Sequence, residues 1–156
     1  MTPTGRPGPR RLRGQSGQVG GIEAVPFGLL VLVVGVLVLA HTWAVVDAKF
    51  VTAASAREAT RAYVEAPTAA RAQDDAQQSA AAAAAATGRS LDGLDHEPGG
   101  RFGRCTPARF VAALSVPAFG LPWRPDRPTA TVRSSHQELV DPYRDGLPGL
   151  ADCEDP

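Results

Sequence analysis

The hydrophobic pattern of the chain begins with one long apolar run near the N-terminus. Residues 24–46 read AVPFGLLVLVVGVLVLAHTWAVV and hold no formally charged side chain. About 20 apolar residues are enough for a helix to cross a hydrocarbon core of roughly 30 Å. Pro26 would stand in the first turn, where its missing N–H is tolerated. Trp43 stands at the other end, where an indole can lie in the membrane interface. The run predicts a transmembrane helix over residues 23–46.

The helical pattern continues after the apolar run. Arg61 and Glu65 stand four positions apart and can form an ion pair on a helix surface. Pro67 then ends the helix, because the residue before a proline disfavours the helical conformation. Small and apolar residues recur at spacings of three and four, which is typical of a helix that packs on one side; this stripe consists of Val46, Phe50, Ala53, Ala56, Thr60 and Tyr63. We expect it to pack on the distal part of the chain or on a copy of the same helix.

A second helix is predicted over residues 68–87. This segment holds seven consecutive alanines at positions 80–86, and alanine is the strongest helix former. Gly88 follows as a C-terminal cap.

The last third of the chain changes to a period of two. In residues 109–117, Phe110, Ala112, Leu114 and Val116 alternate with Arg109, Val111, Ala113 and Ser115. In residues 129–140, Ala130 and Val132 alternate with Thr131 and Arg133, so both segments are predicted to be short strands. A proline-rich turn around Leu121, Pro122 and Trp123 would join them, and residues 88–104 are predicted to be a solvated loop rich in glycine and acids. Two or three strands alone are marginally stable, so the sheet should lean on a helix.

These elements predict an α+β fold with four segments. Residues 1–22 are a disordered basic leader in the cytoplasm, and residues 23–46 are the transmembrane helix. Residues 47–87 are a helical region outside the membrane, formed by the continuing first helix and the alanine-rich second helix. Residues 88–156 are a small strand and loop domain with an antiparallel sheet of two or three strands.

The charges indicate how the chain is oriented. Lysine plus arginine and aspartate plus glutamate both number 16, but the leader holds four arginines and no acid. The positive-inside rule therefore predicts a single-pass protein of the plasma membrane with a cytoplasmic N-terminus and an extracytoplasmic C-terminus. A cleaved secretory signal is the alternative, although the run exceeds the 7–15 apolar residues usual for such signals. The neutral overall charge gives no reason to expect a nucleic-acid partner.

The chain has two cysteines, Cys105 and Cys153, and both lie in the distal part. An extracytoplasmic location makes an intramolecular disulfide the simplest assignment. Two free thiols and an intermolecular bond remain the alternatives.

The sequence offers no catalytic, metal or cofactor site from which to argue an enzyme. Its histidines, His41, His96 and His136, stand apart from one another and from acids at ligand spacing, and the common nucleotide, hydrolase and zinc motifs are absent. His136 is expected to be an exposed strand residue. No small-molecule substrate is evident, and a non-enzymatic protein is expected.

Glu23 is an ionisable residue immediately before the apolar run. One interpretation is a hydrated carboxylate at the membrane edge. The other is an acid drawn into the bilayer, which needs a partner such as the amine of a neighbouring subunit.

Three stretches resemble one known family. The run GQVGGIEAVPFGLLVLVVGVLVL is followed by VVDAKFVTAASAREATRAYVEAP, and the distal part holds ALSVPAFGLPW and TATVRSSHQELVDPYRDGLPG. Together they resemble the TadE-like minor pilins, or pseudopilins, of the tight-adherence (Flp) pilus system, particularly those of actinobacteria. The resemblance covers roughly residues 14–150.

The resemblance implies a prepilin peptidase that cuts after a glycine, and a pairing glutamate five residues into the mature chain. Glu23 is the matching residue. A count back from Glu23 puts the cut between Gln18 and Val19, whereas a cut after Gly17 would make Glu23 the sixth residue. Both a processed chain and an uncleaved, membrane-anchored relative are therefore open.

The function implied is that of a non-enzymatic membrane-anchored minor pilin or pilus assembly component. Its partners would be membrane lipid, sibling pilins or other pilus assembly proteins, and a prepilin peptidase. A single-pass extracytoplasmic binding or regulatory module unrelated to pili is the competing class, and a cell-envelope enzyme with a docked partner is a third.

Overall fold

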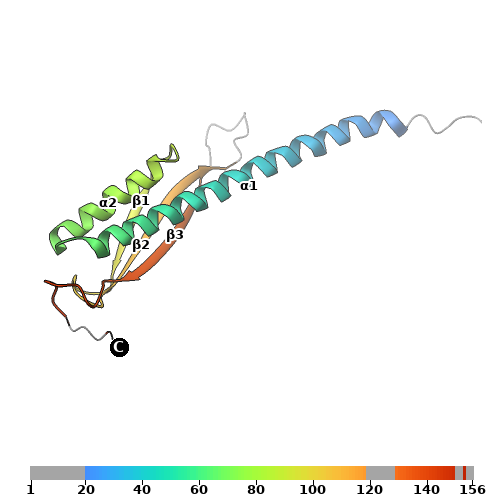
Figure 1. Ribbon diagram of the computed structural model, residues 1–156. Coiled ribbons are helices and arrows are strands. Elements are labelled where there is room, and N and C mark those ends of the chain that lie inside the picture. Colours follow the sequence, from blue (N-terminus) through green and yellow to red (C-terminus); the bar gives the residue numbers. More distant parts are fainter. Residues whose placement is uncertain (1–19, 119–128, 150–152, 154–156) are drawn as a thin grey trace, which may run out of the picture. The chain divides into compact units, whose positions relative to one another are not determined.

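The computed structural model describes residues 20–118, 129–149 and 153. Two helices come first, α1 (Gly20–Glu65) and α2 (Ala69–Ala85), and three strands follow, β1 (Gly93–Pro98), β2 (Pro107–Pro117) and β3 (Thr129–Leu139) (Figure 1). This is the predicted α+β arrangement of a long apolar helix, a second helix and a small antiparallel sheet. The chain divides into two compact units, residues 1–38 and 39–156.

The first unit contains the apolar part of α1. Its side chains from Ala24 to Val38 are all exposed, and its mean hydropathy reaches 2.6 over the most apolar window. Among the described residues, α1 is the one helix long and apolar enough to cross a membrane. The helix begins at Gly20, so Pro26 lies inside it rather than in its first turn as predicted. Because proline has no N–H, the carbonyl of Ile22 loses its helical donor there.

The second unit is built on an antiparallel sheet with the order β1-β2-β3. The loop prediction for residues 88–104 is wrong over β1. Leu94 and His96 are half-buried and Asp95 and Glu97 are exposed, so the alternation of a strand is present, although only one of the two inward residues is aliphatic. Pairing with Phe110 and Ala112 of β2 fixes this weak pattern as a strand.

Both helices pack on the same face of the sheet (Figure 1). On α2, an alanine is buried at every fourth position, at residues 72, 76, 80 and 84. Their small side chains allow α2 to approach α1 and β2. The first three share a buried cluster with Ala59, Tyr63 and Phe110, and Ala84 belongs to a second cluster with Ala48 and Val51. Gly88 has φ +71°, and the amides of Gly88 and Arg89 donate to the carbonyls of Ala85 and Ala84, which is the predicted helix cap.

The buried stripe of α1 differs from the prediction in its first half. Ala56, Thr60 and Tyr63 are buried as predicted, but Val46, Phe50 and Ala53 are exposed. The buried positions there are Ala48, Val51, Thr52 and Ser55. These small or compact side chains let α1 pack closely on the chain's own domain, where a phenylalanine would not fit. The predicted turn at Leu121, Pro122 and Trp123 lies outside the described residues.

Candidate functional site

The residues proposed for processing and subunit pairing are at the N-terminal limit of the structure. Glu23 belongs to the first turn of α1, but its side chain lies outside the described part. Gly17, Gln18 and Val19 also lie outside the described residues. The second unit holds α1 from its turn at Asp47 to its last residue, Glu65.

The charged residues that follow the apolar run contact the domain. Arg89, which follows α2, places its Nη2 atom 2.7 Å from Asp47 Oδ2 in a half-exposed ion pair. Lys49 Nζ donates to the carbonyl oxygen of Arg133 on β3 at 2.5 Å. The sequence predicts charges at this point but gives no signal for their partners, which are 42 and 84 positions away.

Further along, α1 is held to β3 by buried hydroxyl groups. Thr52 Oγ1 and Ser134 Oγ lie 2.7 Å apart in a buried hydrogen bond. Thr60 Oγ1 lies 2.7 Å from the carbonyl oxygen of Ala56 in its own helix and 3.3 Å from that of His136 on β3, and its one proton is shared between these two acceptors. Ser55 lies between them, and among the described residues its buried hydroxyl has no hydrogen-bond partner. Hydroxyl groups thus fix the register of the helix on the strand.

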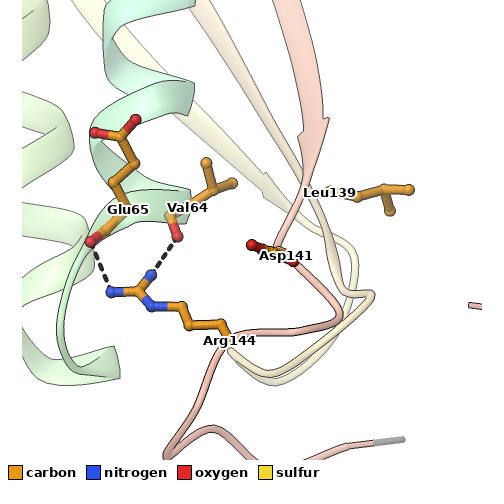
Figure 2. A pocket seen from close by; sticks show the side chains of 5 residues that line it. All are labelled: Val64, Glu65, Leu139, Asp141 and Arg144. Carbon is orange, nitrogen blue, oxygen red and sulfur yellow. Dashed lines mark hydrogen bonds between the residues drawn. The ribbon is translucent and has the colours of Figure 1, made fainter. Parts of the chain in front are cut away.

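The end of α1 is closed by Arg144, as Figure 2 shows. Arg144 Nη1 donates to the carbonyl oxygen of Val64 at 2.5 Å, and Nη2 donates to that of Glu65 at 2.7 Å. The last carbonyls of a helix have no partner within the helix, and a cation is favourable at this end of the helix dipole. Arg144 therefore supplies both the missing hydrogen-bond donors and the favourable positive charge. It lies at one wall of an open hollow of about 440 Å³ that Leu139 and Asp141 also line.

The segment around Arg144 is built to hold it. The amide of Tyr143 donates to Asp141 Oδ1 at 2.8 Å, which forms a tight turn just before the arginine. Arg104 Nε donates to the carbonyl oxygen of Arg144 at 2.8 Å, and the amide of Arg104 donates to Pro148 at 2.8 Å. Gly149 has φ +114°, and a Cβ there would lie 3.2 Å from the carbonyl oxygen of Arg104. The sequence VDPYRDGLPG therefore has a structural role as a clamp on α1.

A disulfide closes the same region. Cys105 and Cys153 are bonded, with their Cα atoms 5.3 Å apart, so the predicted intramolecular pair is the one found. The amide of Cys105 donates to Val140, and the amide of Val140 donates to Thr106, both at 3.0 Å. Cys105 has φ 60°, a left-handed conformation that is uncommon for a residue with a side chain. The bond connects the C-terminal segment to the loop before β2.

Four rings form an aromatic cluster beneath the end of α1. His96 stacks on Phe110 with ring centroids 4.5 Å apart, and Tyr63 contacts His96 at 4.6 Å. Phe102 and Phe110 each lie 5.4 Å from the Tyr63 ring. Burial lowers the pKa of His96 and raises that of Tyr63, because both neutral forms are favoured away from water. Sequence analysis missed this cluster, since it placed His96 in a loop.

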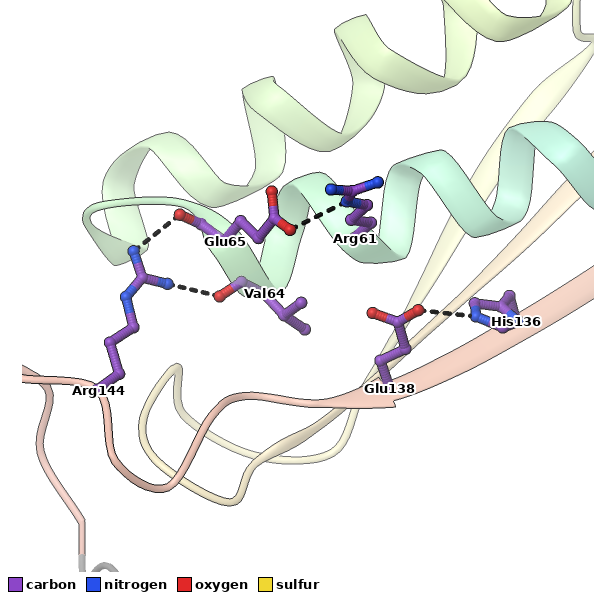
Figure 3. Close-up of polar contacts among 6 residues, drawn as sticks. All are labelled: Arg61, Val64, Glu65, His136, Glu138 and Arg144. Carbon is purple, nitrogen blue, oxygen red and sulfur yellow. Dashed lines mark hydrogen bonds and ion pairs between the residues drawn. The ribbon is translucent and has the colours of Figure 1, made fainter.

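Two polar pairs lie near the clamp, the exposed Arg61–Glu65 pair and the His136–Glu138 pair, which is half-buried although an exposed His136 was predicted (Figure 3). The predicted Arg61–Glu65 pair is present at 3.0 Å, and the hydrogen bond to Glu65 raises the pKa of Arg61. His136 Nε2 lies 2.9 Å from Glu138 Oε1, so the prediction that this histidine stands apart from acids is wrong. The two residues are alternate positions on β3 and therefore share one face of the strand.

Within the described ranges, no three histidine, cysteine or acidic side chains gather as a metal site. The contacts described above hold α1 at both ends of the segment that packs on the small domain. Compared with protein-family models, with curated proteins and with solved structures, the chain has no match.

Proposed function

We propose that this chain is a non-enzymatic, membrane-anchored minor pilin or pilus assembly component of a tight-adherence system. It would sit in the plasma membrane with its N-terminus in the cytoplasm and its small domain outside. The observation that carries the proposal is that α1 is a single helix with two uses. Its apolar part is exposed from Ala24 to Val38, and its later part supplies buried residues to the domain core from Ala48 onward.

A helix of this kind suits an assembly subunit for a physical reason. Force on the apolar part would be passed to the domain through the hydroxyl contacts, the Asp47–Arg89 pair and the Arg144 clamp. The domain would therefore stay attached to the helix when subunits move out of the membrane. The segment VDPYRDGLPG, which carries part of the resemblance to the pilin family, is the segment that forms the clamp on α1.

In the proposed mechanism, sibling helices pack through their apolar parts, and Glu23 pairs with the N-terminal amine of a neighbour where processing occurs. Opposite charges about 4 Å apart attract far more strongly in an apolar setting than in water. Such a pair would fix the axial register of adjacent subunits. If the chain is not processed, Glu23 would be a hydrated carboxylate at the membrane edge. The chain would then assist assembly without entering a fibre.

The test is crosslinking in cells that express the full chain with the other pilus components. Glu23→Gln keeps the size of the side chain and removes its charge. We expect normal membrane abundance and a loss of crosslinks to sibling pilins. Glu58→Gln is the matched control, because Glu58 is an exposed acid on the same helix, and it should crosslink normally. Wild-type chain that never crosslinks to a pilus component would favour a binding module unrelated to pili.

A further inference from the structure

An exposed apolar face at the end of the predicted membrane span continues on α1 to Phe50, which lies beyond that span. Trp43, Val46 and Phe50 are separated by three and four positions, so they lie on one side of the helix. Their side chains are 74%, 41% and 72% exposed. The opposite side of the same turns is fully used, because Ala48 and Val51 are buried in the domain core.

The polar residues around this face leave a positive charge. Asp47 is neutralised by Arg89. Lys49 donates to a backbone carbonyl of Arg133, so its charge is not paired there, and the Arg133 side chain beside it is exposed. Lys49 and Arg133 also line an open hollow of about 300 Å³ at this edge of the domain. Lys49 is therefore the cation beside these exposed apolar side chains. Arg133 adds a second positive charge at the same edge of the domain, on the sheet face opposite α1, because its neighbour Ser134 faces the helix.

The apolar face is also short. The exposed residues that follow Phe50 on this side of α1 are Ala53 and Ala54, and then Arg57 and Arg61. Three large side chains over two turns offer far less than the roughly 800 Å² per partner that a stable protein interface buries. Along α1, the exposed side chains change from apolar to charged within one turn. Such a sharp boundary fits the surface of a membrane better than it fits a packed second helix.

We propose that Trp43, Val46 and Phe50, with Lys49 beside them and Arg133 at the same edge of the domain, dock on the surface of an anionic phospholipid bilayer. Trp and Phe side chains enter the interfacial layer, and lysine and arginine are attracted to anionic headgroups. The membrane contact then reaches Phe50, one turn past the predicted span. This inference rests on the membrane anchoring in the proposed function and not on its pilus role.

The experiment uses the full chain in vesicles of equal parts phosphatidylcholine and phosphatidylglycerol. Separate variants Leu32→Cys, Phe50→Cys and Arg57→Cys carry an environment-sensitive fluorophore, and lipid-borne quenchers sit either at the headgroup or deep in the acyl chains. We expect headgroup quenching of the Phe50 label to exceed that of the Arg57 label by about twofold or more, because Arg57 lies two turns further along the same side. All three substituted side chains are exposed, so the fold should be retained.

The outcomes separate the two proposals. Deep quenching at position 32 without headgroup quenching at position 50 overturns the docking face and leaves the anchoring intact. No quenching at position 32 contradicts the anchoring itself. Phe50→Cys chains that crosslink to each other instead of being quenched also overturn the proposal, since the face would be an interface between copies. Lys49→Gln combined with Arg133→Gln should reduce quenching at position 50. Equal quenching in vesicles of phosphatidylcholine alone would contradict the anionic preference.

Discussion

Arg144 Nη2 lies 2.7 Å from the carbonyl oxygen of Glu65, the last residue of α1, so a side chain from the C-terminal segment closes the end of the helix. A second bond from the same guanidinium reaches Val64. The planar fork of arginine holds both donors in one fixed geometry, whereas the donors of a lysine ammonium radiate from a single nitrogen on a flexible stem.

Arg144→Met should lower the free energy of unfolding by about 2 kcal/mol, because it removes two charge-assisted hydrogen bonds. Arg144→Lys should recover part of this loss. Arg71→Met on the exposed side of α2 is the matched control and should change little. Thermal denaturation of the full chain in detergent, followed by circular dichroism, gives the comparison. Equal stability of the Arg144 and Arg71 variants would mean that the clamp does not hold α1.

The disulfide should stabilise the domain by about 3 to 4 kcal/mol, because Cys105 and Cys153 are 48 positions apart and their bond restricts the unfolded chain. Addition of a reductant should lower the melting temperature of the wild-type chain. The double variant Cys105→Ser with Cys153→Ser should melt at that lower temperature whether reductant is present or not. Labelling of two thiols per chain without reductant would contradict the bond.

Two of the three buried hydroxyls of α1, those of Thr52 and Ser55, should differ in their effect on stability when they are removed. Thr52→Val leaves the buried Ser134 hydroxyl without its 2.7 Å partner and should cost about 1 to 2 kcal/mol. Ser55→Ala removes a buried hydroxyl that has no partner among the described residues, so stability should be unchanged or rise by up to about 1 kcal/mol. Urea titration of both variants tests this contrast. A larger loss for Ser55→Ala than for Thr52→Val would show that Ser55 is bonded in solution.

Stability should fall in mild acid because of His96. Burial lowers the pKa of His96 in the folded chain below its usual value of about 6.5. The unfolded chain therefore binds the proton first. The contribution of neutral His96 to the free energy of unfolding is complete above about pH 6.5. It is lost as the pH falls through the lower pKa of His96 in the folded chain. Melting temperatures measured from pH 7.5 to pH 5 should show this decline.

Two variants in the same aromatic cluster test the role of His96, and the second of them is the control. His96→Phe keeps an aromatic ring against Phe110 and removes the titrating group, so the decline should become shallower. Tyr63→Phe keeps the histidine and should retain the decline. An unchanged pH dependence in His96→Phe would assign the effect to other groups.

The sequence predicts the elements that depend on local patterns. The apolar run, the end of α1 before Pro67, the alanine-rich helix capped at Gly88 and the two alternating strands are all present. Each of these signals comes from neighbouring residues. The fold class follows from them with little tertiary information. The Cys105–Cys153 pair was the simplest of three assignments because both cysteines lie in the part predicted to be outside the membrane, and it is the one found.

The features that could not be predicted depend on distant contacts. β1 is a strand because it pairs with Phe110 and Ala112, and its own residues are too polar to indicate this. Phe50 matches the helical stripe, yet it is exposed because the packing of α1 on the domain selects Ala48 and Val51 instead. Arg144 belongs to a segment without periodic structure, so its contacts with Val64 and Glu65 become evident only in the folded chain.

The most direct measurement of the proposed function is the yield of pili sheared from the surface of native cells. Cells that lack this chain should release much less pilus material, and the wild-type chain supplied in trans should restore it. Glu23→Gln should fail to restore it, whereas Glu58→Gln should succeed. A normal yield of sheared pili from cells without the chain would contradict a role in pilus assembly.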